Sequence, residues 1–266
     1  MVLVVKVGGA LAYPPPDHLV EDIVKVAGKE RLVLVHGGAR EVTRVAEAMG
    51  VKQRFIVSPS GFRSRYTDRE TMEIFLMVMA GRVNKELVSR LCARGLRALG
   101  LTGVDGSLIK AVRKRKLIVV EKGRKRVIDG GYTGRIKEVN THLLDRLLKL
   151  GVTPVIAPVA MGEEGEPLNV DADRVAAYVA GSIKAEEIVV LTDVEGLIVN
   201  GKLVSRVSAG ELDGYIKLAR HGMRRKLYAA KEALNMGVKR VVIASGLKPN
   251  PVSTALKHES CTVIEP

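Results

Sequence analysis

Short runs of aliphatic residues alternate along the chain with longer segments in which apolar residues recur every three or four positions. The short runs are continuously apolar, which is typical of buried parallel strands, and the longer segments have the spacing of amphipathic helices. The predicted strands are Val2 to Val7, Arg31 to Val35, Thr153 to Ala157, Glu187 to Leu191 and Lys239 to Ala244. The predicted helices are Asp17 to Lys29, Arg40 to Met49, Arg69 to Ala80, Asn140 to Leu150, Asp173 to Gly181 and Gly222 to Met236. This β-α-β order predicts an α/β fold with a mainly parallel central sheet and helices on both faces.

A different pattern occupies the middle of the chain, where short strand-like runs are separated by glycine and charged residues. Lys116 to Glu121 and Arg126 to Asp129 flank the segment Lys122-Gly123-Arg124-Lys125. Two such runs around a glycine-containing turn predict an inserted β-hairpin, which we expect on the edge of the sheet. The hairpin is strongly basic, because residues 113–126 include eight Lys or Arg among fourteen positions.

The composition is that of a folded globular protein. The 266 residues are 47% hydrophobic and 27% charged, which excludes a disordered chain. Forty-three Lys or Arg against 29 Asp or Glu give a net charge of +14, so the protein attracts nucleotides, acidic metabolites, acidic proteins or nucleic acids. Only 3% of the residues are aromatic and none is Trp, which disfavours single-stranded nucleic acid because its bases stack on aromatic rings.

Cysteine usage and the amino terminus restrict the class further. Cys92 and Cys261 are distant in sequence, so we expect no disulfide framework or zinc site, and we expect both to be buried. The first eleven residues carry Lys6 centrally, unlike a signal peptide, and no uncharged apolar stretch is long enough for a membrane span. We therefore expect a cytoplasmic protein. A single glutamine, Gln53, beside many charged residues indicates a thermophile.

Two glycine pairs follow predicted strands. The first strand ends in Lys6-Val7-Gly8-Gly9, and the second ends in His36-Gly37-Gly38, directly before a helix. The carboxyl ends of parallel strands form the binding crevice of such sheets, and glycine lets backbone N–H groups approach a phosphate. Each pair alone could be a tight turn. Together with Lys6, whose ammonium is costly to bury without an anion, they predict a phosphate site.

Three later segments complete a pattern. Leu168-Asn169-Val170-Asp171-Ala172-Asp173 opens a helix, Thr192 to Leu197 follows a strand, and Gly222-Met223-Arg224-Arg225-Lys226 opens another helix. With the two glycine pairs before them in this order, the chain resembles the amino acid kinase family, specifically its N-acetylglutamate kinase branch. The resemblance implies a three-layer α/β/α sandwich of the carbamate kinase-like type. It also implies an acceptor-binding lobe at about 1–182 and an ATP-binding lobe at about 183–266.

Two finer features resemble one subgroup of that branch. They are the segment Gly61 to Asp68, which contains Arg-x-Thr-Asp at 65–68, and Gly130-Gly131-Tyr132-Thr133-Gly134. The subgroup comprises archaeal and Thermus kinases that phosphorylate 2-aminoadipate or glutamate while its amino group is linked to the acidic carrier protein LysW, in lysine and sometimes arginine biosynthesis. Ala39 departs from the pattern, since a third glycine is usual there. An N-acetylglutamate kinase and, from another class, a basic nucleic-acid-binding protein are the alternatives.

The resemblance implies catalytic roles for Lys6 and Lys226, one from each lobe, on the transferring phosphoryl group, with Asp173 between them. A side-chain carboxylate is ionised at neutral pH, so the acceptor needs no general base. It does need its repulsion from the phosphates to be offset, so catalysis is mostly positioning and charge stabilisation. The alternative role for Asp173 is to stabilise the N-terminus of a helix, worth about 0.3–1 kcal/mol.

The resemblance also implies the remaining site residues. Backbone N–H groups of Gly8, Gly9, Gly37 and Gly38 would donate to the phosphate and the acceptor carboxylate. Arg65, or alternatively Arg63, would bind the free α-carboxylate. The substrate residues are Gly37, Gly38, Arg65 and Asn169, and the phosphate and ATP residues are Gly8, Gly9, Asp193, Gly196, Gly222 and Met223. ATP with Mg²⁺ is expected, and a homodimer is the default.

The basic hairpin has two interpretations. It is either a solvated surface or an electrostatic docking site for the acidic carrier, because complementary charge steers encounter and fixes orientation. The predicted docking residues are Arg113, Lys114, Arg115, Lys116, Arg124, Lys125 and Arg126.

Overall fold

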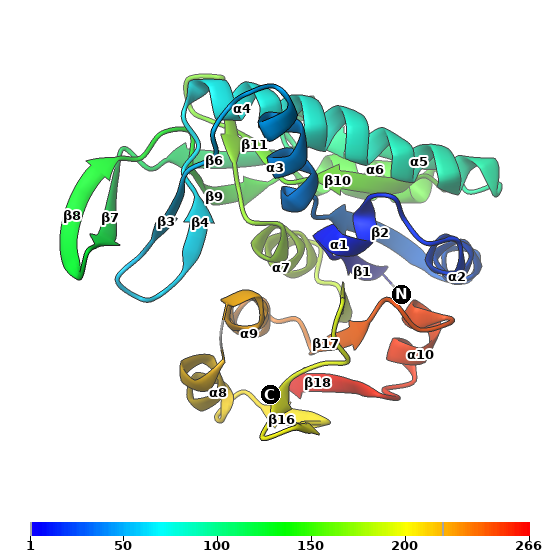
Figure 1. The fold of residues 1–266 in the computed structure, drawn as a ribbon. Coiled ribbons are helices and arrows are strands. Elements are labelled where there is room, and N and C mark those ends of the chain that lie inside the picture. The colour runs from blue at the N-terminus through cyan, green and yellow to red at the C-terminus, as the bar shows by residue number, and fades with distance from the viewer. Residues whose placement is uncertain (1, 220) are drawn as a thin grey trace.

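The computed structural model describes residues 2–219 and 221–266, which form three layers in the order helices, sheet, helices (Figure 1). The middle layer is an eight-stranded sheet with the order β16-β18-β17-β13-β1-β2-β10-β5. Neighbouring strands are parallel except β17 and β18, which are antiparallel. Its strands are β1 (Val2–Val7), β2 (Arg31–His36), β5 (Ala98–Thr102), β10 (Thr153–Ala157), β13 (Glu187–Thr192), β16 (Arg206–Ser208), β17 (Arg240–Ser245) and β18 (Cys261–Glu265). The predicted α/β fold with a mainly parallel sheet is therefore confirmed.

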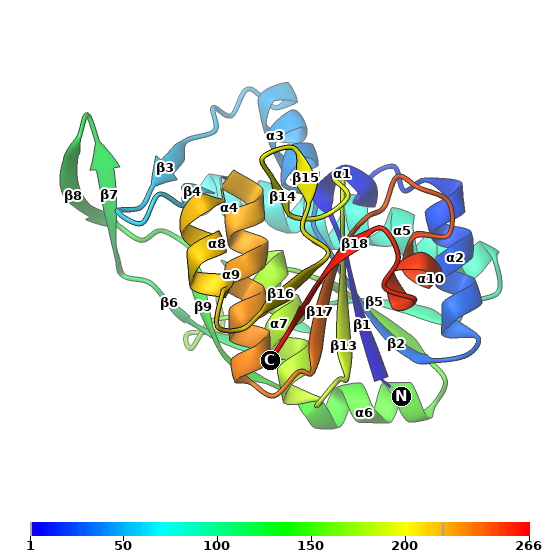
Figure 2. The same cartoon turned by 90° about the horizontal axis from the view of Figure 1, so that it is seen from below.

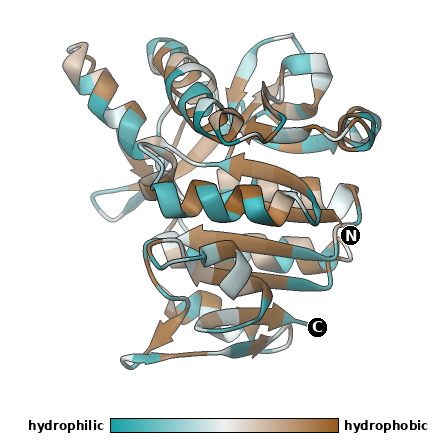
Figure 3. Cartoon of the chain, turned by 90° about the vertical axis from the view of Figure 1, so that its right-hand side faces the viewer, coloured by the Kyte–Doolittle hydropathy of each residue, from teal (hydrophilic) through white to brown (hydrophobic). Residues whose placement is uncertain are grey.

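Successive strand residues point to opposite faces and build two separate apolar cores, so that Leu3 and Val4 lie in different ones. Figure 3 shows the strands of the sheet as mostly hydrophobic, between helices of mixed character. One face is covered by α6 (Thr141–Lys149), α7 (Ala172–Ser182), α8 (Leu212–Leu218) and α9 (His221–Asn235). The other face is covered by α1 (Gly9–Ala12), α2 (Asp17–Ala27), α3 (Ala39–Ala48), α4 (Arg69–Leu76), the π-helix η1 (Met77–Val83), α5 (Asn84–Ala93) and α10 (Pro251–Leu256).

Smaller sheets lie outside the central one, and the strands β3, β4, β7 and β8 extend from one end of the sandwich (Figure 2). A four-stranded sheet has the order β12-β11-β6-β9, and a short 3₁₀ turn, η2 (Asp105–Ser107), precedes β6. Three separate hairpins pair β3 with β4, β7 with β8, and β14 with β15. These strands are β3 (Phe55–Val57), β4 (Arg63–Arg65), β6 (Ile109–Arg113), β7 (Lys116–Glu121), β8 (Arg124–Asp129), β9 (Gly134–Val139), β11 (Val159–Met161), β12 (Pro167–Asn169), β14 (Ile198–Val199) and β15 (Lys202–Leu203).

The basic hairpin is β7–β8, and its predicted place on the edge of the central sheet is wrong. It forms a two-stranded sheet of its own that projects from the body between β6 and β9 (Figure 1). Its second strand begins at Arg124, two residues earlier than predicted, because Lys122 and Gly123 alone make the turn. Both turn residues have positive φ, as a two-residue type I′ turn requires.

The predicted helix that ends at Ala80 is also too short. Helix α4 passes directly into the π-helix η1 and then into α5, so one helical segment continues to Ala93. Gly81 lies inside η1 and does not end the helix, although glycine weakens helices. The other predicted strands and helices occur with ends that shift by a residue or two. β5, β16 and β18 were not predicted as strands of the central sheet, and helices α8 and α10 were not predicted.

Two further expectations concern single residues and the membrane. Cys261 is buried as expected, but Cys92 is exposed on α5, so the expectation of two buried cysteines is wrong for Cys92. Within residues 2–219 and 221–266, no helix has the length and apolarity that crossing a membrane requires.

Candidate active site

The carboxyl ends of β1, β2 and β13 lie side by side and carry the two glycine pairs. A Cβ atom on Gly37 would lie 2.8 Å from the backbone nitrogen of Gly9, and one on Gly9 would lie 2.9 Å from that of Gly38. Real Cβ atoms essentially never come this close, so the two backbone turns pack together only because both are glycine. The glycine loops after β1 and β2 are therefore in direct backbone contact at the edge where the crevice is predicted.

The four glycines do not offer four free N–H groups. Gly8 N–H donates to the carbonyl of Leu191 at 2.9 Å, and Gly37 N–H donates to the carbonyl of Val7 at 2.9 Å. Both bonds extend the parallel ladder by one step beyond the strands, so the expectation that Gly8 and Gly37 donate to a phosphate is wrong. Among the residues that the structure describes, the N–H groups of Gly9 and Gly38 have no hydrogen-bond acceptor.

Lys6, Asp173 and Lys226 come from three elements and meet beside these loops. The ammonium nitrogen of Lys6 on β1 lies 2.7 Å from Oδ1 of Asp173, at the start of α7. The ammonium nitrogen of Lys226 on α9 lies 3.7 Å from Oδ2 of the same carboxylate. Their side chains are 6%, 9% and 12% exposed respectively, so the three charges share one buried cluster.

The cluster keeps its carboxylate ionised. Burial raises the pKa of Asp173, but the charges of Lys6 and Lys226 outweigh it, and the pKa stays below its ordinary value. Burial lowers the pKa of Lys226, and the charge of Lys6 adds to this effect while Asp173 opposes it. Asp171 fixes the backbone of Asp173. As the N-cap of α7, its side chain accepts the Asp173 backbone N–H at 2.9 Å.

The predicted ATP residues lie around the same edge of the sheet. Asp193 follows β13, where the Thr192 hydroxyl donates to it at 3.1 Å and the Arg40 guanidinium lies 3.3 Å away. Burial raises the pKa of Asp193, but its own N–H, Thr192, Arg40 and Lys226 outweigh this and hold the pKa below its ordinary value.

The glycines of the ATP set have different surroundings. A Cβ on Gly222, in the first turn of α9, would lie 4.0 Å from the ammonium of Lys226, so this turn borders the lysine cluster and Met223 follows in the same turn. A Cβ on Gly196 would lie 2.5 Å from the Thr262 hydroxyl oxygen, which means that Gly196 lets the loop after β13 pack on β18.

Arg65 lies next to the second glycine pair. Its guanidinium donates to the carbonyl of Ala39 and to the Thr43 hydroxyl, both at 2.8 Å, and to the Gln53 side chain. Burial and then the charge of Arg63 lower the pKa of Arg65 to about 10. The side chain is therefore held over the first turn of α3, immediately after Gly38.

Arg63 and Asn169 are placed differently. The Arg63 guanidinium lies 4.0 Å from the Phe55 ring centroid, a ring that the Arg65 guanidinium also approaches, at 5.1 Å, and Arg63 is exposed. Asn169 lies at the end of β12, and its amide donates to the Thr67 hydroxyl at 2.9 Å. Arg65 is thus buried beside the start of α3 and Asn169 is bonded to the neighbouring segment at Thr67, whereas Arg63 is exposed.

The sequence reasoning missed two buried side chains that hold the glycine turn. His36 is fully buried, and its Nδ1 donates to the Gly37 carbonyl at 2.8 Å. The Asn84 amide donates to Nε2 of His36 at 3.1 Å and to the Val155 carbonyl at 2.9 Å. Burial, and then Lys6, lower the pKa of His36 to about 4, so the ring is neutral. Only the position of His36 before two glycines could have signalled this role, and nothing marks Asn84.

The seven predicted docking residues divide into two groups. Arg113 and Lys114 face inward: Arg113 donates to the Gly131 carbonyl at 2.7 Å and stacks 4.4 Å above the Tyr132 ring. Lys114 is half-buried, and burial followed by the charge of Arg174 lowers its pKa. Both pack against the body at the base of the hairpin, so they are less accessible to a docking partner than the other five.

The other five are exposed on or beside the hairpin. Arg115 pairs with Glu164, and Arg126 lies 3.8 Å from Glu121 on the neighbouring strand. The remaining exposed residues are Lys116, Arg124 and Lys125.

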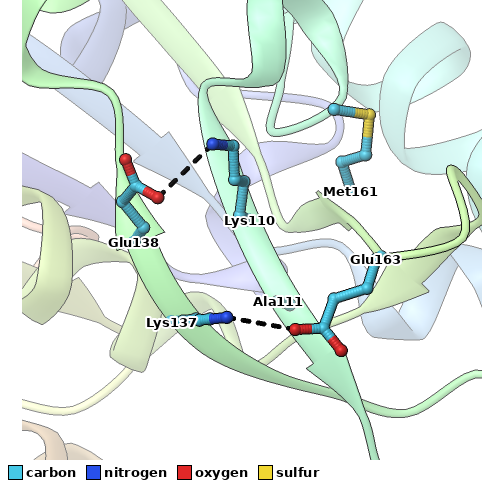
Figure 4. A pocket seen from close by; sticks show the side chains of 7 residues that line it. Lys110, Ala111, Lys137, Glu138, Met161 and Glu163 are labelled. Atoms are coloured by element: carbon cyan, nitrogen blue, oxygen red, sulfur yellow. Dashed lines mark hydrogen bonds and ion pairs between the residues drawn. The ribbon is translucent and has the colours of Figure 1, made fainter.

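A pocket of about 270 Å³ lies away from this edge, between β6, β9 and the end of β11 (Figure 4). Its cations are already paired, since Lys110 lies 3.4 Å from Glu138 and Lys137 lies 3.1 Å from Glu163. None of the predicted site residues lines it. In the part of the chain that is described, no group of three or more His, Cys, Asp or Glu is arranged to hold a metal ion.

Comparisons with known proteins agree with this geometry. Residues 1–245 match the model of the amino acid kinase family. A protein of Saccharolobus islandicus (strain L.S.2.15 / Lassen #1), 41% identical over 265 residues and covering 99% of both chains, is named LysW-aminoadipate/LysW-glutamate kinase. A protein of Cenarchaeum symbiosum (strain A), 51% identical over 264 residues with 99% of both chains covered, bears that name with the prefix "Putative".

Solved structures show the same fold. N-acetylglutamate synthase from Neisseria gonorrhoeae, in complex with coenzyme A and N-acetyl-glutamate, is 27% identical with a TM-score of 0.82. The match covers 100% of this chain and 59% of that one. Carbamate kinase from Giardia lamblia bound to citric acid is 15% identical with a TM-score of 0.67, covering 99% and 98% of the two chains.

Proposed function

The chain belongs to the amino acid kinase family, and from this premise we propose that it phosphorylates the side-chain carboxylate of 2-aminoadipate or glutamate whose amino group is linked to the acidic carrier protein LysW. ATP is the phosphoryl donor, and the product is an acyl phosphate. The observation that carries the proposal is the convergence of Lys6 and Lys226 on Asp173, beside two glycine turns with free N–H groups. The two curated relatives with LysW in their names support the choice of acceptor.

The proposed step forms a bond between an oxygen of the acceptor carboxylate and the γ-phosphorus while the bond to the leaving ADP oxygen breaks. The nucleophile is already an anion, so repulsion between it and the phosphates is the main obstacle. Lys6 and Lys226 offset this charge from two directions. Asp173 holds both ammonium groups in place, and its low pKa keeps it ionised for that purpose.

Backbone donors complete the phosphoryl site in this proposal. Of the four glycines, only Gly9 and Gly38 serve as donors in this proposal. Their N–H groups have no acceptor among the described residues, whereas those of Gly8 and Gly37 do. His36 fixes the Gly37 carbonyl and thereby orients the peptide that carries the Gly38 N–H group. Donors aimed at developing charge typically contribute about 100-fold or more each to the rate.

The nucleotide and the acceptor approach from different sides. We propose that Asp193, Gly196, Gly222 and Met223 contact ATP, and that the acceptor lobe ends near residue 182, between α7 and β13. Lys6 then belongs to the acceptor lobe and Lys226 to the ATP lobe. Magnesium bound with the nucleotide would offset phosphate charge and would be held mainly by phosphate oxygens and water.

Arg65 and Asn169 are the proposed acceptor residues. A guanidinium binds a carboxylate through two parallel hydrogen bonds, and Arg65 is buried beside the start of α3, whereas Arg63 is exposed. A carboxylate bound in this way would replace bonds that Arg65 now donates to Ala39, Thr43 and Gln53. Aminoadipate and glutamate differ by one methylene, which changes binding by only about 1–3 kcal/mol, so the proposal includes both acceptors.

We propose that the outer part of the β7–β8 hairpin docks the carrier. The exposed cations Lys116, Arg124 and Lys125 lie on strands that project from the body, where an acidic partner can reach them (Figure 1). Arg115 and Arg126 add charge, although each has an acidic neighbour. Two copies of the chain would form a homodimer, and the reaction would take place in the cytoplasm, where ATP is available.

Hydroxylamine trapping of the acyl phosphate tests this function. With ATP, we expect a hydroxamate from LysW-linked aminoadipate or LysW-linked glutamate, and a much slower reaction with free N-acetylglutamate at equal concentration. Preference for free N-acetylglutamate would replace the proposal with an N-acetylglutamate kinase. Absence of turnover together with steeply salt-dependent nucleic-acid binding would favour the nucleic-acid alternative.

A further inference from the structure

Arg225 precedes Lys226 on α9, and none of the roles above uses it. Its guanidinium lies 3.2 Å from Oδ2 of Asp171 and also donates to the backbone carbonyl of Arg63 on β4. One planar side chain therefore joins three elements, namely α9, the N-cap of α7 and the β3–β4 hairpin.

The three elements are those that carry the proposed site. Arg225 is adjacent to Lys226, Asp171 stands two residues before Asp173, and Arg63 stands two residues before Arg65. Asp171 also accepts the backbone N–H of Asp173 through its other oxygen, Oδ1. If Arg225 moves, Asp171 passes the displacement to Asp173 on the phosphoryl side. Arg63 passes it to Arg65 on the acceptor side.

A second set of contacts joins α9 to the tip of the β3–β4 hairpin. Arg224 donates to the Ser60 carbonyl at 3.2 Å, and the Phe62 and Tyr228 rings meet edge to face with centroids 5.8 Å apart. The hairpin, which belongs to the acceptor side, is therefore fastened along the first two turns of the helix that bears Lys226.

We infer that Arg225 is a positioning residue that aligns Lys226 and Asp173 with the acceptor hairpin, so that phosphoryl transfer is fast only when α9 and β4 are joined. Its side chain is 40% exposed, so its ion pair with Asp171 adds little to stability. The guanidinium geometry matters, because two acceptors in different directions need a planar fork that a lysine ammonium does not provide.

Kinetics of Arg225→Ala, Arg225→Lys and the control Lys231→Ala test this inference, and this arm rests on the proposed function. We expect Arg225→Ala to lower kcat for the carrier-linked acceptor by about 10- to 100-fold, the loss that a misplacement of about 1 Å causes. The KM for ATP should stay within about twofold, and Arg225→Lys should recover only a small part of kcat. Lys231→Ala removes a cation of α9 that pairs with Asp213 on α8, and it should leave kcat unchanged.

A double-mutant cycle identifies the route. Asp171→Asn keeps an N-cap side chain but loses the charge that Arg225 binds. If Arg225 acts through Asp171, the double variant should be no slower than the slower single variant. Fully additive losses, or a kcat for Arg225→Ala within twofold of the wild type, would overturn the inference.

Hydrogen exchange provides a readout that does not depend on the identity of the substrate. In Arg225→Ala the amides of residues 58–65 should exchange faster, while those of the central strands β1 and β13 stay as slow as in the wild type. Unchanged exchange at 58–65 would overturn the inference even if the enzyme proved to use another acceptor. Faster exchange throughout the sheet would overturn it in favour of a general structural role.

Discussion

At the sheet edge, the side chains of Lys6, Asp173 and Lys226 are 6%, 9% and 12% exposed, whereas Arg115 and Arg126 near the hairpin are 64% and 65% exposed. Both regions are rich in cations, but water screens only the second. An exposed ion pair contributes about 0–1 kcal/mol, while removal of one partner from a buried pair costs about 3–5 kcal/mol. Burial therefore fits the catalytic role proposed for the first region, and exposure fits the docking role proposed for the second.

The largest expected effect is on stability, from Asp173→Asn. The change leaves two buried ammonium groups without their counter-charge, so the free energy of unfolding at pH 7 should fall by about 3–5 kcal/mol in urea titrations. The folded pKa of Asp173 lies below its ordinary value of 3.8, so the stabilisation is present above that pH and is lost as pH falls through the folded pKa. The difference between variant and wild type should therefore shrink in acid. An equal difference in acid and at neutral pH would contradict the buried ion cluster.

Next in size are the separate substitutions Lys6→Ala and Lys226→Ala. Each should lower kcat by about 100-fold or more, comparable to the loss of an oxyanion donor, as measured by hydroxamate formation. Lys110→Ala is the matched control, because it removes a lysine from an exposed ion pair and should leave kcat unchanged. Near-normal turnover in either site variant would remove that lysine from the mechanism.

A smaller effect is expected from Arg124→Glu combined with Lys125→Glu. The KM for the carrier-linked acceptor should rise by about tenfold at low salt and less at high salt, with the KM for ATP unchanged. Lys25→Glu with Lys29→Glu changes the net charge equally on α2 and its end, away from the hairpin in Figure 1, and should leave both KM values unchanged. Equal rises in both KM values, or equal effects in the control, would contradict docking at the hairpin.

The smallest effect is expected from protonation of His36. Because the pKa of His36 is about 4, its ring stays neutral, and kcat between about pH 5.5 and 8 should show no inflection due to this residue. An inflection near pH 6.5 that disappears in His36→Asn would show that His36 titrates and does not simply hold the Gly37 carbonyl. His36 would then be a titrating group of the site and not a neutral structural residue.

Much of the fold could be predicted, because buried parallel strands such as Val2–Val7 are continuous apolar runs with little ambiguity. The short strands β16 and β18 carry no such signal, and Gly81 reads as a helix end although the π-helix continues through it. β16 and β18 are strands because they pair with each other and β18 also pairs with β17, and the sequence of each strand does not encode that pairing.

The site was predictable to the level of residues but not of atoms. The motifs place Lys6, Asp173 and Lys226 near one another through a family resemblance. They do not reveal that the ladder consumes the N–H groups of Gly8 and Gly37. Likewise, a run of basic residues in the sequence does not show that Arg113 donates to the Gly131 carbonyl, because side-chain direction depends on the strand pairing.

The adjacency of β1 and β13 has a consequence for biosynthesis of the enzyme. β1 pairs with a strand that begins 185 residues later in the chain, at Glu187, and its lysine shares the Asp173 carboxylate with Lys226, which comes later still. A nascent chain therefore has the β13 edge of β1 unpaired until most of these residues have emerged, and contacts of such long separation form slowly. Under the proposed mechanism, phosphotransfer cannot begin before Lys226 has emerged, and protection of β1 during synthesis falls to its early neighbour β2.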